Sequence, residues 1–144
     1  MSKTIFLASD HGGFELKNHI AQHLAQSGHS YQDLGTDSDT SVDYPDFAQV
    51  LVKEIQQDPD AVGVLVCGTG IGISMKANRN KGIRAAVVYD TFTAEMAKAH
   101  NNANVLCLGG RTTAPELACE LIDLWLNTEF EGGRHQNRLD KLDI

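Results

Sequence analysis

The sequence predicts an α/β fold in which helices cover both faces of a five-stranded parallel sheet. Apolar runs of strand length alternate with helix-like segments from one end of the 144 residues to the other, and the connections between them are short. The run 61–67 is apolar almost without interruption. That pattern is typical of a strand covered on both faces. A single domain over residues 1–144 is therefore expected.

Three strands and two helices are expected in the first half of the chain. In order they are strand 5–8, helix 14–26, strand 31–34, a helix from Pro45 to about residue 57, and strand 61–67. Gly28 follows the first helix, where glycine often ends a helix. Pro45 suits the first turn of the second helix, because an N–H at that position would be unpaired anyway. The stretch 36–43 is polar and typical of a turn.

Two strands and three helices are expected in the second half, followed by a helical tail. A glycine loop and a helix follow the central strand; then come strand 85–88, helix 91–99, strand 105–108 and helix 114–126. The tail after residue 127 ends in a short charged stretch of helical character.

The composition excludes several classes of protein. Twelve basic and nineteen acidic residues leave a net charge of −7, which argues against non-specific binding to nucleic acid or to a membrane surface. No apolar run approaches the roughly 18 residues of a membrane-spanning helix, and the N-terminus lacks the apolar run of a signal peptide. A cytoplasmic protein is expected. Three cysteines without C-x-x-C spacing favour neither a disulfide scaffold nor a zinc site.

Polar and glycine residues gather near the ends of the expected strands. The segments are 9–13, 67–72, 89–90, 100–102 and 109–111. The carboxyl ends of parallel strands lie at one edge of a sheet, where ligands bind in such folds. A thiol, two imidazoles, a carboxylate, an arginine and a glycine loop are therefore expected to converge there.

Cys67 and the glycine loop 68–72 together form the segment that says most about function. Its small residues let the backbone approach a ligand closely, and the N–H groups at the start of the next helix favour a phosphate or an oxyanion. The position of Cys67 before a helix favours the thiolate, whereas Cys107 and Cys119 lie inside apolar patterns and fit a core. The loop is not a dinucleotide fingerprint, because Ile73 stands where the third glycine would be.

Three further features suggest a site only in combination. His11 follows Asp10, and His100 precedes two asparagines, but neither histidine has a metal-binding spacing. Arg134 and Arg138 are four residues apart, so in a helix they share one face and suit a phosphate.

Six segments together resemble the type B ribose-5-phosphate isomerases, a family that includes the galactose-6-phosphate isomerase subunits. They are Ser-Asp-His-Gly-Gly at 9–13, Asp-Tyr-Pro at 43–45, Cys-Gly-Thr-Gly-Ile-Gly-Ile-Ser at 67–74 with Ala-Asn at 77–78, Gly-Ile-Arg-Ala at 82–85, His-Asn-Asn-Ala-Asn-Val-Leu at 100–106, and Glu-Gly-Gly-Arg-His at 131–135. The resemblance extends over about residues 4–142. It implies a three-layer Rossmann-like sandwich with no metal and no cofactor.

The resemblance also implies roles for individual residues. Cys67 would be the base that moves a proton between C1 and C2 of the sugar, and His100, assisted by Asp10, would open the sugar ring. The enediolate would be stabilised by Thr69 and by the backbone of Gly68, Gly70, Ile71 and Gly72. The phosphate would be held by His11, Arg111, Arg134 and Arg138, and Asn101 would contact the sugar hydroxyls. A homodimer or homotetramer with active sites at the subunit interface is implied, with the tail 128–144 packing on the partner.

The resemblance leaves the substrate open between two classes. Ribose 5-phosphate is expected, and allose or galactose 6-phosphate is the alternative within the family. Some members use a glutamate base, but here Cys67 is present and Ile73 is not a carboxylate. Asn102 departs from the aspartate more usual in the family.

Two function classes outside the family are disfavoured. A nucleotide-binding module could use Asp90 on a ribose, but the third glycine of its fingerprint is missing. A phosphoacceptor domain with Asp10 as acceptor would need a second carboxylate beside it, and the sequence offers none there.

Overall fold

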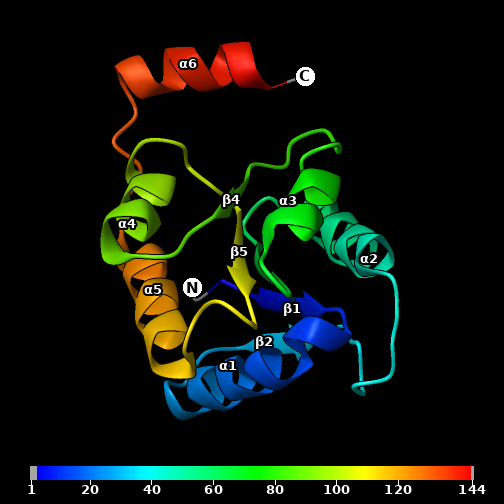
Figure 1. The fold of residues 1–144 in the computed structure, drawn as a ribbon. Helices are drawn as coiled ribbons and strands as arrows, with labels where there is room; N and C mark the ends of the chain where they lie inside the picture. The colour runs from blue at the N-terminus through cyan, green and yellow to red at the C-terminus, as the bar shows by residue number, and fades with distance from the viewer. Residues whose placement is uncertain (1–2, 144) are drawn as a thin grey trace.

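The computed structural model describes residues 3–143 as a three-layer α/β sandwich (Figure 1). Its five strands are β1 (Ile5–Ser9), β2 (Tyr31–Asp33), β3 (Val62–Cys67), β4 (Ala85–Val87) and β5 (Val105–Gly109). All pair in parallel, in the order β2-β1-β3-β5-β4. The helices are α1 (Phe14–Gln26), α2 (Tyr44–Gln57), α3 (Ile71–Ala77), α4 (Thr91–Ala99), α5 (Pro115–Asn127) and α6 (Arg134–Leu142), with a short 3-10 turn at His11–Gly13. The predicted fold class is confirmed.

Alternating strand side chains build one core on each face of the sheet. Ile5, Val64 and Leu106 pack with α1, α4 and α5, whereas their neighbours Phe6 and Leu65 pack with α2 and α3. Successive side chains of a strand point to opposite faces, so a strand buried on both faces must be apolar throughout. This explains the uninterrupted apolar run of β3, all of which is buried.

The strand order places the carboxyl ends of β1 and β3 at a switch point. From β1 the chain moves outward to β2 and then crosses back over β1 to reach β3. Neighbouring loops then leave the sheet in opposite directions, which opens a crevice at the carboxyl edge. Asp10 and Cys67 stand at this crevice, because Ser9 and Val66 are partners in the β1–β3 register.

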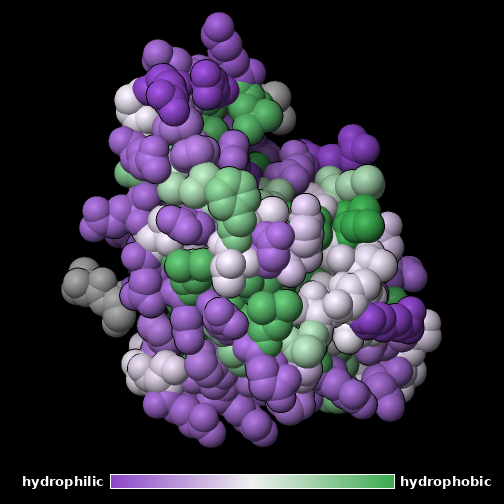
Figure 2. Space-filling view, turned by 60° about the vertical axis from the view of Figure 1, so that its left-hand side comes forward, coloured by the Kyte–Doolittle hydropathy of each residue, from purple (hydrophilic) through white to green (hydrophobic). Residues whose placement is uncertain are grey.

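α6 lies outside the three layers, above them in Figure 1. Gly132 and Gly133 both have positive φ angles, +71° and +56°, which glycine adopts without strain, and they redirect the chain into the helix. His135 and Leu139, one turn apart, are buried, whereas Arg134 and Arg138 are exposed. Figure 2 shows mainly hydrophilic side chains on the outside of this helix, at the top of the molecule.

No helix within residues 3–143 combines the length and the apolar character needed to cross a membrane.

Candidate active site

Three glycine-containing loops meet at the carboxyl edge of the sheet. Gly110 donates its N–H to the Cys67 carbonyl at 2.8 Å, and Arg111 donates its N–H to the Gly68 carbonyl at 3.0 Å. A side chain on Gly110 would collide with the Gly12 backbone, and one on Gly13 would collide with the Val66 carbonyl. Glycine is therefore required for the loops after β1, β3 and β5 to approach one another this closely.

The thiol of Cys67 is held at the end of β3, beside the start of α3. The residue is 5% exposed, and its Sγ accepts the Gly70 N–H at 3.2 Å. Gly70 has a φ of +81° and caps α3, and the first N–H groups of a helix lack partners within it. The sulfur therefore lies where backbone donors gather.

Cys107 and Cys119 differ from Cys67 in their surroundings. Cys107 is fully buried inside β5, and burial, followed by the charge of Cys67, raises the pKa of its thiol. Cys119 is only half-buried in α5, so the prediction of a core cysteine holds for Cys107 and not fully for Cys119.

Asp10, Thr69 and Arg111 surround the segment 67–72, which combines Cys67 with the glycine loop and is called the thiol loop below. Asp10 is 7% exposed and accepts the Gly13 N–H at 3.1 Å, which caps the short turn after β1. The Arg111 guanidinium lies over Gly68, with Nη1 3.4 Å from the place where a Cβ on that glycine would stand. Thr69 is exposed, and its Oγ1 accepts the Ile71 N–H at 3.2 Å. A carboxylate, a hydroxyl and a guanidinium thus border one loop.

Two contacts, one from the loop before α2 and one from the first residue of α2, complete this edge. The segment Asp-Tyr-Pro at 43–45 carries part of the family resemblance, but neither contact was predicted from the sequence. Val42 donates its N–H to His11 Nδ1 at 3.2 Å, which leaves the proton of a neutral imidazole on Nε2. The Tyr44 ring packs against Gly72, where a Cβ would lie 2.7 Å from Cζ. These contacts fix the orientation of His11 and the position of the thiol loop.

His100 and Asn101 lie at the opposite edge of the sheet, which corrects the expected convergence. α4 starts after the carboxyl end of β4 and ends before the amino end of β5, so it runs antiparallel to the strands. Asn104 accepts the Gly63 N–H at 2.9 Å, which places this loop at the start of β3 and β5. Four residue steps of about 3.3 Å, some 13 Å of strand, separate the two edges. One chain does not bring His100 to its own Cys67.

His100 lies in a cluster with Glu131 and His135 that spacing did not reveal. The two imidazole rings stack with centroids 4.0 Å apart. Glu131 Oε1 lies 3.7 Å from His100 Nε2 and 3.4 Å from His135 Nε2. Desolvation lowers the pKa of His135, the charges of His100, Arg134 and Arg138 lower it further, and Glu131 opposes them.

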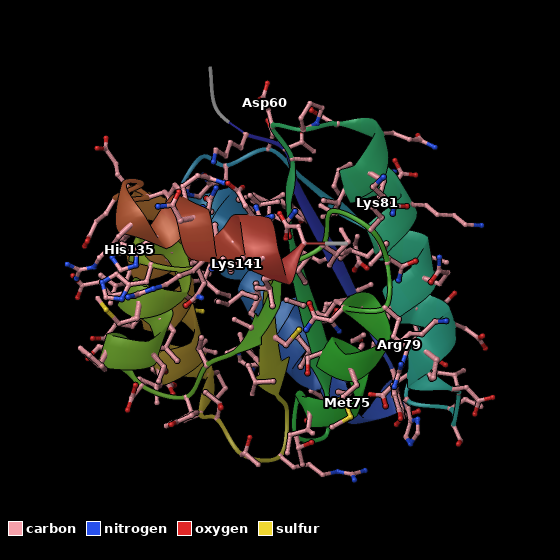
Figure 3. The ribbon with its side chains drawn as sticks, turned by 90° about the horizontal axis from the view of Figure 1, so that it is seen from above. Asp60, Met75, Arg79, Lys81, His135 and Lys141 are labelled. Atoms are coloured by element: carbon pink, nitrogen blue, oxygen red, sulfur yellow. The ribbon has the colours of Figure 1, made fainter. Side chains whose placement is uncertain are left out.

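The two tail arginines point away from the chain's own core. Arg134 and Arg138 are exposed on α6, beside the buried positions of His135 and Leu139. Seen from above in Figure 3, His135 lies over α4, well to the side of Met75 on α3. The thiol loop and the arginines therefore belong to different parts of the molecule.

Asp90 has a structural role in the described chain. Its carboxylate accepts the Thr93 N–H at 2.8 Å and caps α4, and this backbone hydrogen bond, followed by that of the Thr93 hydroxyl, lowers the pKa of Asp90. The capping box accounts for the aspartate without a nucleotide ribose.

Comparison with known proteins identifies a match over almost the whole chain. The family model described as Ribose/Galactose Isomerase matches residues 5–142. Ribose-5-phosphate isomerase B of Escherichia coli K12 is 41% identical over 140 residues, which cover 97% of this chain and 94% of that protein.

Solved structures share this fold. A ribose 5-phosphate isomerase of Thermotoga maritima superposes with a TM-score of 0.97 at 45% identity, covering 99% of each chain. Ribose-5-phosphate isomerase B of Mycoplasma genitalium, solved with bound ribulose-5-phosphate, superposes with a TM-score of 0.94 at 44% identity, covering 99% of this chain and 95% of that one.

Proposed function

This chain belongs to the ribose/galactose isomerase family, and from that premise we propose that it interconverts ribose 5-phosphate and ribulose 5-phosphate. The observation that carries the proposal is the Cys67 thiol, held by the Gly70 N–H at the switch point of a fold shared with a relative that binds ribulose-5-phosphate. The reaction is an aldose–ketose isomerisation through an enediolate.

Cys67 is the proposed base. A proton on carbon next to a carbonyl is weakly acidic, so its removal needs a positioned base and a place for negative charge on oxygen. The thiolate takes the proton from C2 of the aldose and returns it to C1, while the hydroxyl proton passes from O2 to O1. No atom is gained or lost. The charge that develops on oxygen lies beside Thr69 and the N–H groups of residues 68–72.

The phosphate does not react, so its proposed partners supply binding energy that positions the sugar. His11 and Arg111 border the thiol loop on one chain. Arg134 and Arg138 present two guanidinium groups on one exposed face, and planar guanidinium groups suit phosphate oxygens.

We propose that a second copy of the chain completes each site, in a homodimer or homotetramer. His100, Asn101 and the tail arginines lie too far from Cys67 of their own chain to share one sugar phosphate with it. A second copy that docks its α4 end and α6 on the thiol loop would bring His100 to the ring oxygen and Asn101 to the hydroxyls, opposite Asp10. Exposed apolar side chains beside the thiol loop support such a contact: Ile71 and Met75 on α3 are 51% and 60% exposed.

Turnover of three sugar phosphates tests the proposal. Ribose 5-phosphate, allose 6-phosphate and galactose 6-phosphate are assayed side by side, with EDTA present. Fast turnover of the pentose is expected. Turnover of a hexose alone would keep the mechanism and change the substrate, and no turnover of any would contradict the proposal.

A further inference from the structure

We propose that His100, Glu131 and His135 form a binding site for a divalent transition metal ion such as Zn²⁺, and that the bound ion inhibits the enzyme. The inhibition rests on the proposed function of His100 as the ring-opening acid. Binding of the ion is independent of that function, because it depends only on the three side chains.

The spacing of the three ligand atoms suits one metal ion. Glu131 Oε1 lies 3.4 Å from His135 Nε2 and 3.7 Å from His100 Nε2, and ligand atoms of all three side chains lie within 4.8 Å of one another. Tetrahedral zinc with bonds of about 2.0–2.2 Å holds its ligand atoms about 3.3–3.6 Å apart. Tetrahedral coordination by all three side chains requires the His100 ring, whose side chain is 37% exposed, to leave its stack with His135 and turn toward Glu131.

These contacts are longer than good hydrogen bonds. N–H···O bonds usually measure about 2.7–3.2 Å, and both separations here exceed that range. The imidazole rings meet face to face, at an interplanar angle of 14°, and stacking does not use the ring nitrogens. An imidazole binds a metal ion in the plane of its ring, so the two stacked rings share one ion only when the more exposed ring, that of His100, turns out of the stack.

The cluster joins one fixed ligand to two accessible ones. The His135 side chain is 7% exposed, whereas those of His100 and Glu131 are 37% and 55% exposed. The Glu131 N–H donates to the Ala99 carbonyl at 2.9 Å, which holds this loop against the end of α4. Two histidines and one carboxylate with an open fourth position form a known zinc ligand set.

The charges around the cluster affect how tightly it is expected to bind a metal ion. Arg134 and Arg138 lie near enough to His135 to lower its pKa, and their positive charges oppose a second cation. We therefore expect weaker binding than at a structural zinc site. A bound ion takes the lone pair of His100 that would otherwise carry the proton, so ring opening stops until the ion leaves.

Metal titration tests binding independently of catalysis. Co²⁺, followed by its visible absorption, and Zn²⁺, followed by calorimetry, are titrated into the full chain carrying Cys67→Ser and Cys119→Ser, which removes the thiol of the proposed active site and the half-buried thiol of α5. One ion per chain is expected. Adding Glu131→Gln or His135→Gln should weaken binding at least about tenfold, whereas Glu129→Gln, an exposed neighbour, should not. Equal binding with and without Glu131→Gln would overturn the site.

Inhibition is tested separately with the unaltered enzyme. Zn²⁺ should slow turnover of ribose 5-phosphate, and EDTA should restore it. The Glu131→Gln variant should tolerate Zn²⁺ at a concentration that halves wild-type activity. Equal sensitivity of both proteins would overturn the inhibitory role. Absence of turnover in EDTA would instead contradict the proposed function and leave the binding result standing.

Discussion

At the scale of single residues, the surroundings of the Cys67 and Cys107 thiols differ because the two residues occupy different positions along their strands. Cys67 lies in β3 and Cys107 in the neighbouring strand β5, and both face the α2–α3 side of the sheet. Cys107 lies two residues before the end of β5 and is enclosed, whereas Cys67 is the last residue of β3 and receives the Gly70 N–H. A strand end thus exposes a thiol to loop donors that the strand interior lacks, and the sequence alone predicts this difference.

Replacing Cys67 with serine should remove the base and leave the site otherwise intact. Serine retains an acceptor for the Gly70 N–H, but its hydroxyl is a far weaker base than a thiolate. We expect kcat to fall roughly 100- to 10,000-fold, with the Kd for ribose 5-phosphate, measured by calorimetry, within about twofold of the wild-type KM. Cys119→Ser is the matched control and should keep full activity. Substantial turnover by Cys67→Ser would place the base elsewhere.

At the scale of elements, α6 has one face that packs against its own chain and another that is exposed. His135 and Leu139 attach the helix to its own chain, together with an ion pair of 3.1 Å between Arg84 and Asp143 just beyond its end. A groove of about 380 Å³, lined in part by Arg84, Asn101 and Leu142, remains beside that end. Arg134 and Arg138 occupy an exposed face, available to a second copy.

Removing one of these guanidinium groups should weaken substrate binding more than catalysis. For Arg138→Ala we expect KM to rise about tenfold and kcat to change less than about threefold, because a group that holds the phosphate equally in ground and transition states affects only binding. Lys141→Ala on the same helix controls for loss of positive charge and should leave KM unchanged. An unchanged KM in Arg138→Ala would remove Arg138 from the phosphate site.

α4 carries a buried ammonium group whose removal should stabilise the fold. Lys98 is 6% exposed, with Nζ 4.9 Å from the centre of the Trp125 ring. Desolvation, and then the charge of Lys3, lower its pKa from 10.5 to about 8. The unfolded chain therefore binds this proton more tightly, and wild-type stability rises with pH between these two values.

We expect Lys98→Met to raise the free energy of unfolding at pH 7 by about 1–2 kcal/mol, after allowing for loss of the cation–π contact. The gain should be full below about pH 8 and disappear as the pH approaches 10.5. Urea unfolding at several pH values measures it, with exposed Lys53→Met as control. A gain that grows with pH would contradict this account.

At the scale of the whole molecule, the sequence predicted the layers well and the site only in part. Strand and helix patterns are local, so the five parallel strands and the shared face of Arg134 and Arg138 were predictable. The proximity of Asp10, Cys67 and Arg111 was predictable because each follows a strand, and the carboxyl ends of parallel strands lie at one edge of the sheet. The prediction that His100 lies at the same edge was wrong. His100 follows helix α4, and a helix between parallel strands returns the chain to the amino edge of the sheet.

The position of α6 was beyond the reach of sequence patterns. Gly132 and Gly133 permit many directions for the chain that follows them, and tertiary contacts of α6, among them the packing of His135 against His100 and the burial of Leu139, select one. The cluster with Glu131 therefore appears only in three dimensions. The same packing sets His100 and the arginines apart from Cys67, which leads to the central claim that two copies of the chain build each active site.

Activity of a hybrid between two inactive variants tests that claim most directly. Cys67→Ser and His100→Asn chains, carrying different tags, are co-expressed, and the mixed dimer is purified through both tags and assayed on ribose 5-phosphate. If sites are shared, one site of the hybrid pairs Cys67 of one chain with His100 of the other and is complete. The account predicts about half of wild-type activity per dimer. A hybrid dimer as inactive as its two parents, or the absence of any dimer, would contradict it.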